Sequence, residues 1–369
     1  MSPTCRCILS VRRTTRNRSE GFRLARSLLA VSLSATAVSA QPASGTVVGI
    51  VVARESGEVL PHSVVVVPSL DVRRFSNDSG AFVLRDVPAG SHLVQIRRLG
   101  YAPTEVTVAV RPGARDSVRI ELTRIAVTLA PVQVRADPPC TAPGLSAIKD
   151  SVLATVLTQL RMNGEQYRLL TEAYPFVYGH ERIALSELKS GQTRTDLVDT
   201  VLIQSKNTWR YRPGHVLTRE GRRGRGSLFF NLPTLADFAD PLFLDNHCFS
   251  DGGIDRVDDR EFIRIDVVAW SRIKNPDVNG SIFLDPQNFQ IRRSVLRLSR
   301  NPKVNGMTGL EVTTLFQEAL ESVPIITQVY SVQTFDGRDR RRDFVASYEH
   351  HRLVIFRFLG TRPGDDARP

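Results

Sequence analysis

Short runs in which apolar and polar residues alternate, separated by turn-forming residues, constrain the fold of this chain most strongly. They fill the segment from Gly45 to Thr123, for example AFVLRDV at residues 81–87 and HLVQIRR at residues 92–98. A period of two predicts strands, and short strands at this spacing predict an antiparallel β-sandwich. The predicted core of this segment includes Phe82, Leu84, Val94 and Ile96.

Residues 45–124 carry a fairly specific order of motifs, which is NDSGAF, then VPAG, then a Gly-Tyr pair. In this order the segment closely resembles the carboxypeptidase regulatory-like domain. The resemblance implies a seven-strand transthyretin-like sandwich, also classed as a carbohydrate-binding-like fold, that contains no catalytic residues. It also implies a glycan, a peptide or an envelope protein as partner.

A single stretch with helical periodicity, SAIKDSVLATVLTQLRMNG at residues 146–164, precedes a long series of predicted strands. Its apolar residues predict a helix that packs on a sheet, with Ser146 as the N-terminal cap and Asn163-Gly164 as the end. The strands that follow are longer than those of a typical sandwich. They predict a long-stranded antiparallel sheet that is curled or forms a half-barrel, with one packed helix. The chain is therefore expected to be mainly β.

The hairpin DVNGSIFLDPQNFQIRRSVLRL, with its turn at residues 285–288, has a second resemblance. It is similar to the half-barrel of bacterial lipoprotein carriers, and the resemblance extends over residues 174–358. This resemblance implies a concave apolar face that can hold a lipid or an acyl chain.

The basic N-terminus accounts for much of the formal net charge of +11. Residues 1–40 hold seven Arg and one Glu, a net of +6, which leaves +5 for the remainder. An apolar run and the small residues Val38-Ser39-Ala40 then predict a secretory signal cut between Ala40 and Gln41; a transit peptide or a basic arm is the alternative. No later segment is apolar enough to predict a transmembrane helix. We expect an exported protein that is periplasmic, associated with the outer membrane, or extracellular.

The predicted organisation has five parts. They are a signal peptide at 1–40, the sandwich at 45–124, a linker at 125–145, a helix-plus-sheet domain at 146–360 and a disordered tail at 361–369.

Two cysteines remain after the predicted cleavage, Cys140 and Cys248. An even pair in an exported protein predicts one disulfide, which would join the start of the second domain to a loop at residues 245–253. Two unrelated buried thiols are the alternative. A metal site is disfavoured because neither a Cys-x-x-Cys nor a His-x3-His spacing is present.

Motifs of enzymes and metal sites are missing from the sequence. It contains no His-Glu-x-x-His, Gly-x-Ser-x-Gly or P-loop, so we expect no catalytic residues, no cofactor and no metal. His350 and His351 are neighbours on a predicted strand and should point to opposite faces. The acidic stretch 250–261 favours a solvated loop over a calcium site. Because the basic residues do not gather on a helix, nucleic-acid binding is not expected.

The loop GRRGRGS at residues 221–227 is either a hairpin tip or a contact for anionic lipid or lipopolysaccharide, made by Arg222, Arg223 and Arg225. Two functions stay open. The first is a non-enzymatic envelope protein that binds a partner, peptide or glycan through the sandwich. The second is a carrier or assembly factor that holds a lipid or acyl ligand in the second β domain, and a pocket in that sheet would favour it.

Overall fold

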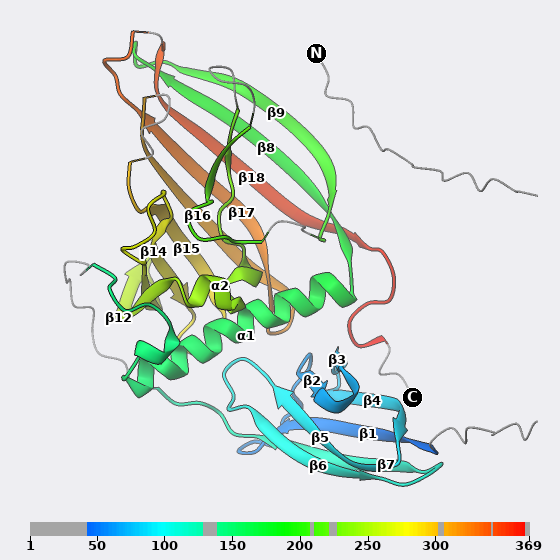
Figure 1. Ribbon diagram of the computed structural model, residues 1–369. Helices are drawn as coiled ribbons and strands as arrows, with labels where there is room; N and C mark the ends of the chain where they lie inside the picture. The colour runs from blue at the N-terminus through cyan, green and yellow to red at the C-terminus, as the bar shows by residue number, and fades with distance from the viewer. Residues whose placement is uncertain are drawn as a thin grey trace, which may run out of the picture. The chain divides into compact units, whose positions relative to one another are not determined.

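The computed structural model describes residues 43–127, 139–206, 210–220, 227–301, 306–340 and 342–365. The predicted cleavage site at Ala40 and Gln41 and the arginines Arg222, Arg223 and Arg225 lie outside these ranges. The fold is mainly β with one long helix, and its sheets are not closed, as the sequence predicts (Figure 1).

Seven strands build the N-terminal sandwich. They are β1 (Ser44–Ala53), β2 (Val64–Val67), β3 (Val72–Phe75), β4 (Ala81–Pro88), β5 (Gly90–Arg97), β6 (Thr104–Val110) and β7 (Arg115–Leu122), with a short 3-10 turn, η1 (Pro68–Leu70), between β2 and β3. One sheet has the order β4-β1-β7 and the other β3-β2-β5-β6. Strand β1 pairs antiparallel with β4 and parallel with β7.

The alternating residues of these strands meet between the two sheets. Phe82 and Ile96 are completely buried and Leu84 and Val94 almost so, which confirms the predicted core. Gly49 in β1 is needed at this position, because a Cβ atom there would lie 2.1 Å from the Phe82 ring. Strand β3 was not among the runs read from the sequence, because its two arginines interrupt the apolar pattern.

A second, larger sheet contains nine antiparallel strands in the order β12-β13-β14-β15-β16-β17-β18-β8-β9. The strands are β8 (Phe176–Leu188), β9 (Thr193–Gln204), β12 (His247–Val257), β13 (Arg260–Ala269), β14 (Val278–Leu284), β15 (Ile291–Leu298), β16 (Met307–Leu320), β17 (Val323–Phe335) and β18 (Phe344–Phe358). The chain runs from β12 to β18 in simple succession, and β18 then lies against β8. The hairpin β8–β9 therefore forms one end of the sheet.

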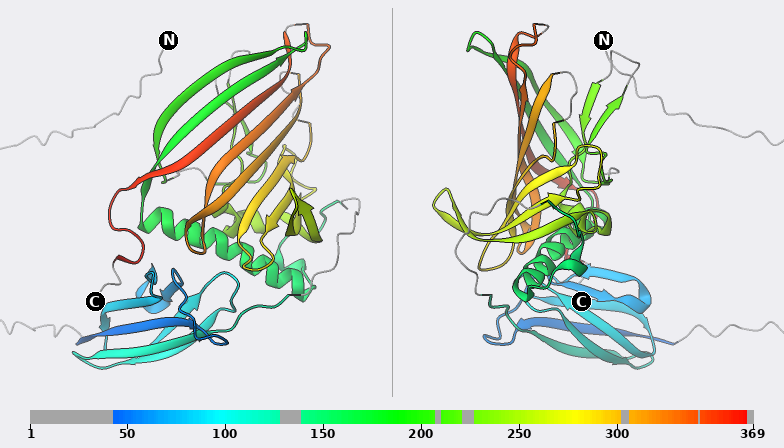
Figure 2. Two further views of the ribbon diagram at one scale, coloured as in Figure 1. Left: turned by 180° about the vertical axis from the view of Figure 1, so that it is seen from behind. Right: turned by 60° about the vertical axis from the view of Figure 1, so that its left-hand side comes forward.

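Six elements outside this sheet lie on one of its faces or lead to it. The 3-10 turn η2 (Leu145–Ala147) precedes α1 (Ser151–Ala173), and η3 (Leu235–Ala239) precedes the short helix α2 (Pro241–Leu244). The two-stranded hairpin of β10 (Leu217–Glu220) and β11 (Ser227–Phe230) stands over the same face as α1 (Figures 1 and 2). The core of this region lies where α1 and η3 pack on the sheet, with Leu157, Leu160, Phe238, Ile265 and Ile282 all buried.

Helix α1 differs from the prediction at both ends. Asp150, rather than Ser146, caps it, since the Asp150 carboxylate accepts from the backbone of Val152 and Leu153 at 2.7 and 3.0 Å. The helix also continues past Asn163-Gly164 to Ala173. Asn163 is buried and bonds to Phe289 O and Ile291 N, while Gly164 lets the helix approach η3. These two residues serve packing, and not helix termination.

The acidic segment is also different from its prediction as a solvated loop. Residues 247–257 form strand β12, with a bulge between Asp251 and Gly253, and they pair with β13. Asp258 and Asp259 make the connecting turn, both with positive φ, which Asp tolerates in tight hairpins. The described residues contain no cluster of His, Cys, Asp and Glu that could hold a metal ion.

The predicted turn at residues 285–288 does connect β14 and β15.

One end of the nine-stranded sheet is poorly covered. Helix α1 packs on the sheet as far as β17, and α2 packs at β12. The strands β9, β8 and β18, in contrast, expose many large apolar side chains: Ile183, Val198, Val201, Leu202, Ile203, Val354 and Phe356. Among the described residues, no helix is both long enough and apolar enough to cross a membrane.

Candidate functional site

A pocket of about 590 Å³ lies between the β10–β11 hairpin and the sheet. Its wall on the sheet comes from β8, β16, β17 and β18, and its cover comes from the end of β11 and the residues after it. The lining comprises His180, Arg182, Phe229, Phe230, Leu232, Leu310, Val312, Ile326, Val329, Ser331, Gln333, Glu349, His351 and Leu353.

Strand register explains why these side chains share one face. Directly paired residues of neighbouring strands point to the same side of a sheet. His180 pairs with Leu353, and Arg182 pairs with His351. His351 in turn pairs with Val329, so alternate residues of β8, β18 and β17 all line the pocket.

The two kinds of side chain occupy different parts of the pocket. Apolar residues come mainly from the hairpin, β16 and β17, and Phe229 is 45% exposed although it lines the cavity. Among the described residues of the lining, the charged and histidine side chains come from β8 and β18. The pocket is therefore amphipathic.

A chain of hydrogen bonds links the polar residues. His180 Nε2 lies 3.0 Å from His351 Nδ1, and the two rings are stacked. His351 Nε2 lies 3.1 Å from a carboxylate oxygen of Glu349. In an arrangement that fits both distances, His351 Nε2–H donates to Glu349 and His351 Nδ1 accepts from His180 Nε2–H.

The surroundings of this chain lower the pKa of His180 and that of Glu349. Burial, followed by the neighbouring His351 and Arg182, lowers the pKa of His180. The hydrogen bond from His351 is the main reason that the pKa of Glu349 is lowered. Arg182 is bound to Asp199 of β9 at 3.1 Å. Within the described residues no Ser, Thr or Cys is hydrogen-bonded to either ring, so the network holds no activated nucleophile.

The sequence indicates these histidines only in part. His350 and His351 point to opposite faces, as predicted, because His350 stacks on Tyr330 while His351 stacks on His180. The pairing of His180 with His351 was missed. The signal that could have found it is in β8, where His180 and Arg182 interrupt a face that otherwise carries Phe176, Tyr178 and Ala184.

A larger hollow of about 900 Å³ lies elsewhere on the sheet, but its lining is different. Three arginines and three acids surround it: Arg260, Arg292, Arg293, Asp258, Glu261 and Asp285. Arg292 is already paired with Asp285 at 3.3 Å, and Arg293 is within 3.9 Å of Asp258. Because its charges balance one another, this hollow offers less for a specific ligand than the amphipathic pocket does.

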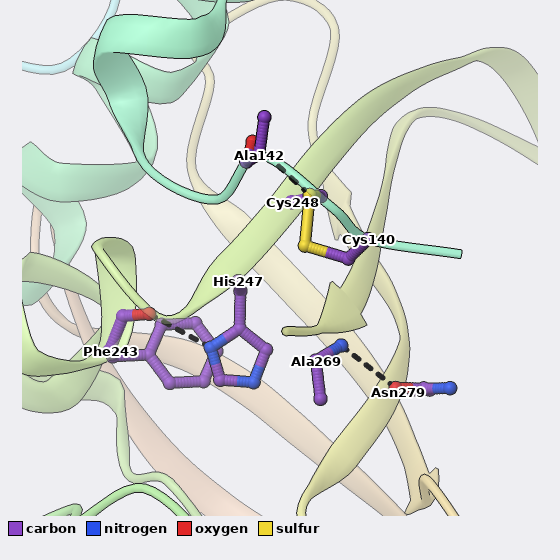
Figure 3. The surroundings of a disulfide bond; sticks show 7 residues. All are labelled: Cys140, Ala142, Phe243, His247, Cys248, Ala269 and Asn279. Carbon is purple, nitrogen blue, oxygen red and sulfur yellow. Dashed lines mark hydrogen bonds between the residues drawn. A yellow bond between two sulfur atoms is a disulfide. The ribbon is translucent and has the colours of Figure 1, made fainter. Parts of the chain in front are cut away.

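The structure contains a disulfide between Cys140 and Cys248, whose Cα atoms are 5.5 Å apart (Figure 3). The bridge joins Cys140 to Cys248, the second residue of β12. It therefore holds a strand, whereas the sequence predicted a loop at residues 245–253. Beside it, His247 is completely buried and stacks on Phe243 at 4.1 Å between ring centroids.

The same corner contains a buried polar network. The Asp277 carboxylate accepts from Tyr211 Oη at 2.8 Å and from Gly214 N at 2.7 Å, and His247 Nε2 is 3.5 Å away. The side chains of Asp277, Tyr211 and His247 are at most 1% exposed. Because the Asp277 carboxylate accepts three hydrogen bonds from within the chain, from Tyr211, Gly214 and the Val278 backbone, we interpret this network as part of the fold.

Comparison with known proteins identifies the first part of the chain. Residues 46–123 match the family model of the carboxypeptidase regulatory-like domain, which confirms the prediction for the sandwich. No curated protein matches the sequence.

Similar solved structures include a LolA superfamily protein from Nitrosomonas europaea, at 8% identity and a TM-score of 0.28. The match covers 57% of this chain and 97% of that protein. A DUF1329 family protein from Desulfovibrio piger has 9% identity and a TM-score of 0.29, over 55% of this chain and 91% of that one. A putative outer membrane lipoprotein-sorting protein domain from Vibrio parahaemolyticus has 8% identity and a TM-score of 0.28, over 57% of this chain and 97% of that one. Likenesses at these TM-scores carry no argument about function, so the inferences below rest on the geometry of this chain.

Proposed function

We propose that this protein is a non-enzymatic carrier that binds an amphipathic ligand, an apolar chain with a polar end, in the pocket under the β10–β11 hairpin. The observation that supports the proposal is the separation of the pocket lining into an apolar part and a polar part. Of the two functions that the sequence leaves open, this geometry favours the carrier of a lipid or acyl ligand.

The size of the pocket is suitable for such a ligand. Ligand sites commonly enclose about 300–1,000 Å³, and a volume of about 590 Å³ lies within that range. Each methylene moved from water into an apolar site contributes about 0.8 kcal/mol, which is about a fourfold gain in affinity. The affinity should therefore rise with the length of the chain until the apolar part of the pocket is full.

The polar part of the pocket would hold the other end of the ligand. Glu349 and the His351–His180 pair can accept from, or donate to, a hydroxyl, an amide or a protonated carboxyl group. Arg182 keeps N–H groups that Asp199 does not occupy, because a guanidinium has five donors. These groups would fix the orientation of a ligand whose binding energy comes mainly from its chain.

We further propose that the protein is exported and works in the bacterial envelope or outside the cell. The support is the leader-like segment before Gln41 and the pairing of the two remaining cysteines.

The sandwich would then provide a second contact, with a glycan, a peptide or an envelope protein. Arg222, Arg223 and Arg225 stay candidates for contact with anionic lipid, and the division at residues 125–145 stays a proposed domain boundary.

Two neighbouring residues of β18 allow a matched test of the pocket. Leu353 lines it and is half-buried, whereas Val354 points to the opposite face and is 51% exposed. A carboxylate at position 353 would have to be buried against the ligand chain, so Leu353→Glu should weaken binding at least about tenfold. The variant Val354→Glu should stay within about twofold of the unchanged protein.

The measurement is titration calorimetry with fatty acids and lysophospholipids of increasing chain length. The expected result is binding that strengthens by about fourfold per methylene and then levels off. A protein that binds none of these probes, or Leu353→Glu binding as well as Val354→Glu, would contradict the proposal.

A further inference from the structure

Strand β9 forms an end of the nine-stranded sheet, and among the described strands it pairs only with β8. It is 12 residues long, and most of its side chains are exposed on both faces of the sheet. Such an edge presents a row of N–H and C=O groups to any strand that can pair with it. Long edges of this kind are normally protected by charged residues, proline or bulges.

Only the first part of β9 has this protection. Arg194 and Asp196 lie there, together with the irregular pairing between β8 and β9. Residues 197–204 have one charge, Asp199, which is bound to Arg182 of the same chain at 3.1 Å. Val198 and Leu202 in this part are 68% and 62% exposed. The unprotected half therefore resembles a pairing surface more than a solvated edge.

We propose that β9 pairs antiparallel with β9 of a second copy of this chain, with Thr200 opposite the partner's Thr200. A two-fold axis at this point gives a closed dimer in which the two nine-stranded sheets become continuous. Leu202 would lie opposite the partner's Val198, and Ile203 opposite the partner's Leu197. Symmetry repeats both contacts, so four apolar pairs flank the central threonines.

Other registers of the same strand are less favourable. With Asp199 at the axis, two carboxylates would lie directly opposite each other, which is destabilising. With Val201 or with Val198 at the axis, the axial residue and its copy would be the single apolar pair between the two strands, whereas the Thr200 register gives four such pairs. The Thr200 register leaves Asp199 opposite the partner's Val201, still bound to Arg182.

The proposed register also extends apolar rows that already exist within one copy. Val198 pairs with Ile183 of β8. Leu202 pairs with Gly179, which lies between Leu202 and Val354 of β18. Joining Leu202 to the partner's Val198 makes a single row across both sheets. A single strand pair buries little surface, so we expect a dissociation constant on the order of micromolar.

Substitutions at the axis test the dimer, because each dimer contains the changed residue twice in one contact. Thr200→Lys places two ammonium groups opposite each other, and Thr200→Glu places two carboxylates there. Each variant alone should have a dissociation constant raised by about tenfold or more, whereas an equimolar mixture should form a heterodimer. The matched control is Thr107→Lys, an exposed threonine on the edge strand β6 of the sandwich, which should leave dimerisation unchanged.

Sedimentation velocity of the mature chain over a range of concentrations measures all four proteins. Reversible dimerisation of the unchanged chain, its loss in both single variants and its return in the mixture would support the proposal. A chain that stays monomeric, whether because another segment of the same chain covers β9 or because this face meets a lipid surface, would overturn it. So would a dimer that persists in Thr200→Lys, or a mixture that stays monomeric.

Discussion

The sandwich and the nine-stranded sheet differ in how the apolar faces of their sheets are covered. In the sandwich, two sheets of three and four strands cover each other, and the alternating residues of each strand are buried between them. Among the described residues no second sheet covers the larger sheet, and α1 packs on it as far as β17. The strands β8, β9 and β18 keep large exposed apolar side chains, and a pocket lies on one face of β8, β16, β17 and β18.

The difference indicates where binding can take place. The sandwich buries most of its apolar side chains in its own core, so little apolar surface remains there for a lipid or acyl ligand. In the larger sheet, the strands extend beyond the elements that cover them, and the surplus apolar surface must be covered by something else. The proposed ligand uses this surplus on one face of β8, β16, β17 and β18, and the proposed second copy uses it at the neighbouring edge strand β9.

The largest effect that distinguishes the two regions should come from the disulfide. Replacing both cysteines, Cys140→Ser with Cys248→Ser, removes a bridge between residues 108 positions apart. The chain-entropy model gives at most about 4–5 kcal/mol for a loop of this size. Hydrogen exchange should quicken in β12 and β13 and stay unchanged in β1 and β7.

Reductant provides the control for this experiment. It should destabilise the unchanged protein to the level of the double variant and have no effect on the variant itself. Two free thiols in oxidised protein, counted under denaturing conditions, would show that the bridge does not form.

A smaller effect is expected at the buried carboxylate beside β14. Burial works to raise the pKa of Asp277, but donors from His247, Gly214 and Tyr211 outweigh it, so this pKa is lowered. Asp277→Asn should cost about 3 kcal/mol at neutral pH, because it replaces a buried carboxylate, whose hydrogen bonds are charge-assisted, by a neutral amide. Asp259→Asn is a suitable control, since Asp259 is 98% exposed in a turn.

The pH dependence of this effect follows from the direction of the shift. Since the pKa of Asp277 is lower in the folded than in the unfolded state, its contribution is complete above the unfolded value of about 3.9. It is lost as the pH falls through the lower, folded value. Denaturant titrations of both variants from neutral to acidic pH should therefore show a difference that narrows below about pH 4. A difference that is independent of pH would argue against an ionised Asp277.

The smallest expected effects on stability come from the same change, Gly→Ala, made once in each region, which compares the packing of the two regions directly. In the sandwich, Gly49→Ala would drive a Cβ atom into the Phe82 ring and should cost about 1–3 kcal/mol. In the larger sheet, Gly179→Ala meets only Val354 O, at 3.9 Å, and should gain about 0.5 kcal/mol. Urea denaturation measures both, and equal effects would show that the two regions are packed alike at these positions.

The sandwich could be predicted well because the pattern of residues within each single strand shows which of them are buried. Each strand alternates between buried and exposed residues, so Val94 and Ile96 are identified without knowing what they pack against. The strand at residues 72–75 escapes the same reasoning, because only two of its four residues are apolar.

The ends of α1 show where local signals fail. An Asn-Gly pair normally ends a helix or makes a turn, and the sequence does not reveal that Phe289 and Ile291 supply the partners of Asn163. The pocket could not be predicted from the sequence either, because its residues come from distant parts of the chain. His180 and His351 are 171 positions apart and meet only because β18 lies beside β8, an arrangement that no local pattern specifies.

The position of β18 between β17 and β8 has a consequence for how the chain acquires its structure. Strands β12 to β17 can add to one another as successive hairpins, but β8 and β9 must wait for the last strand before they join the sheet. Contacts this distant in sequence close late and slow the search for the native state. Until then, the unpaired β8 and β17 are open edges, so the rate-limiting step should be the insertion of β18, and premature association should compete with that step.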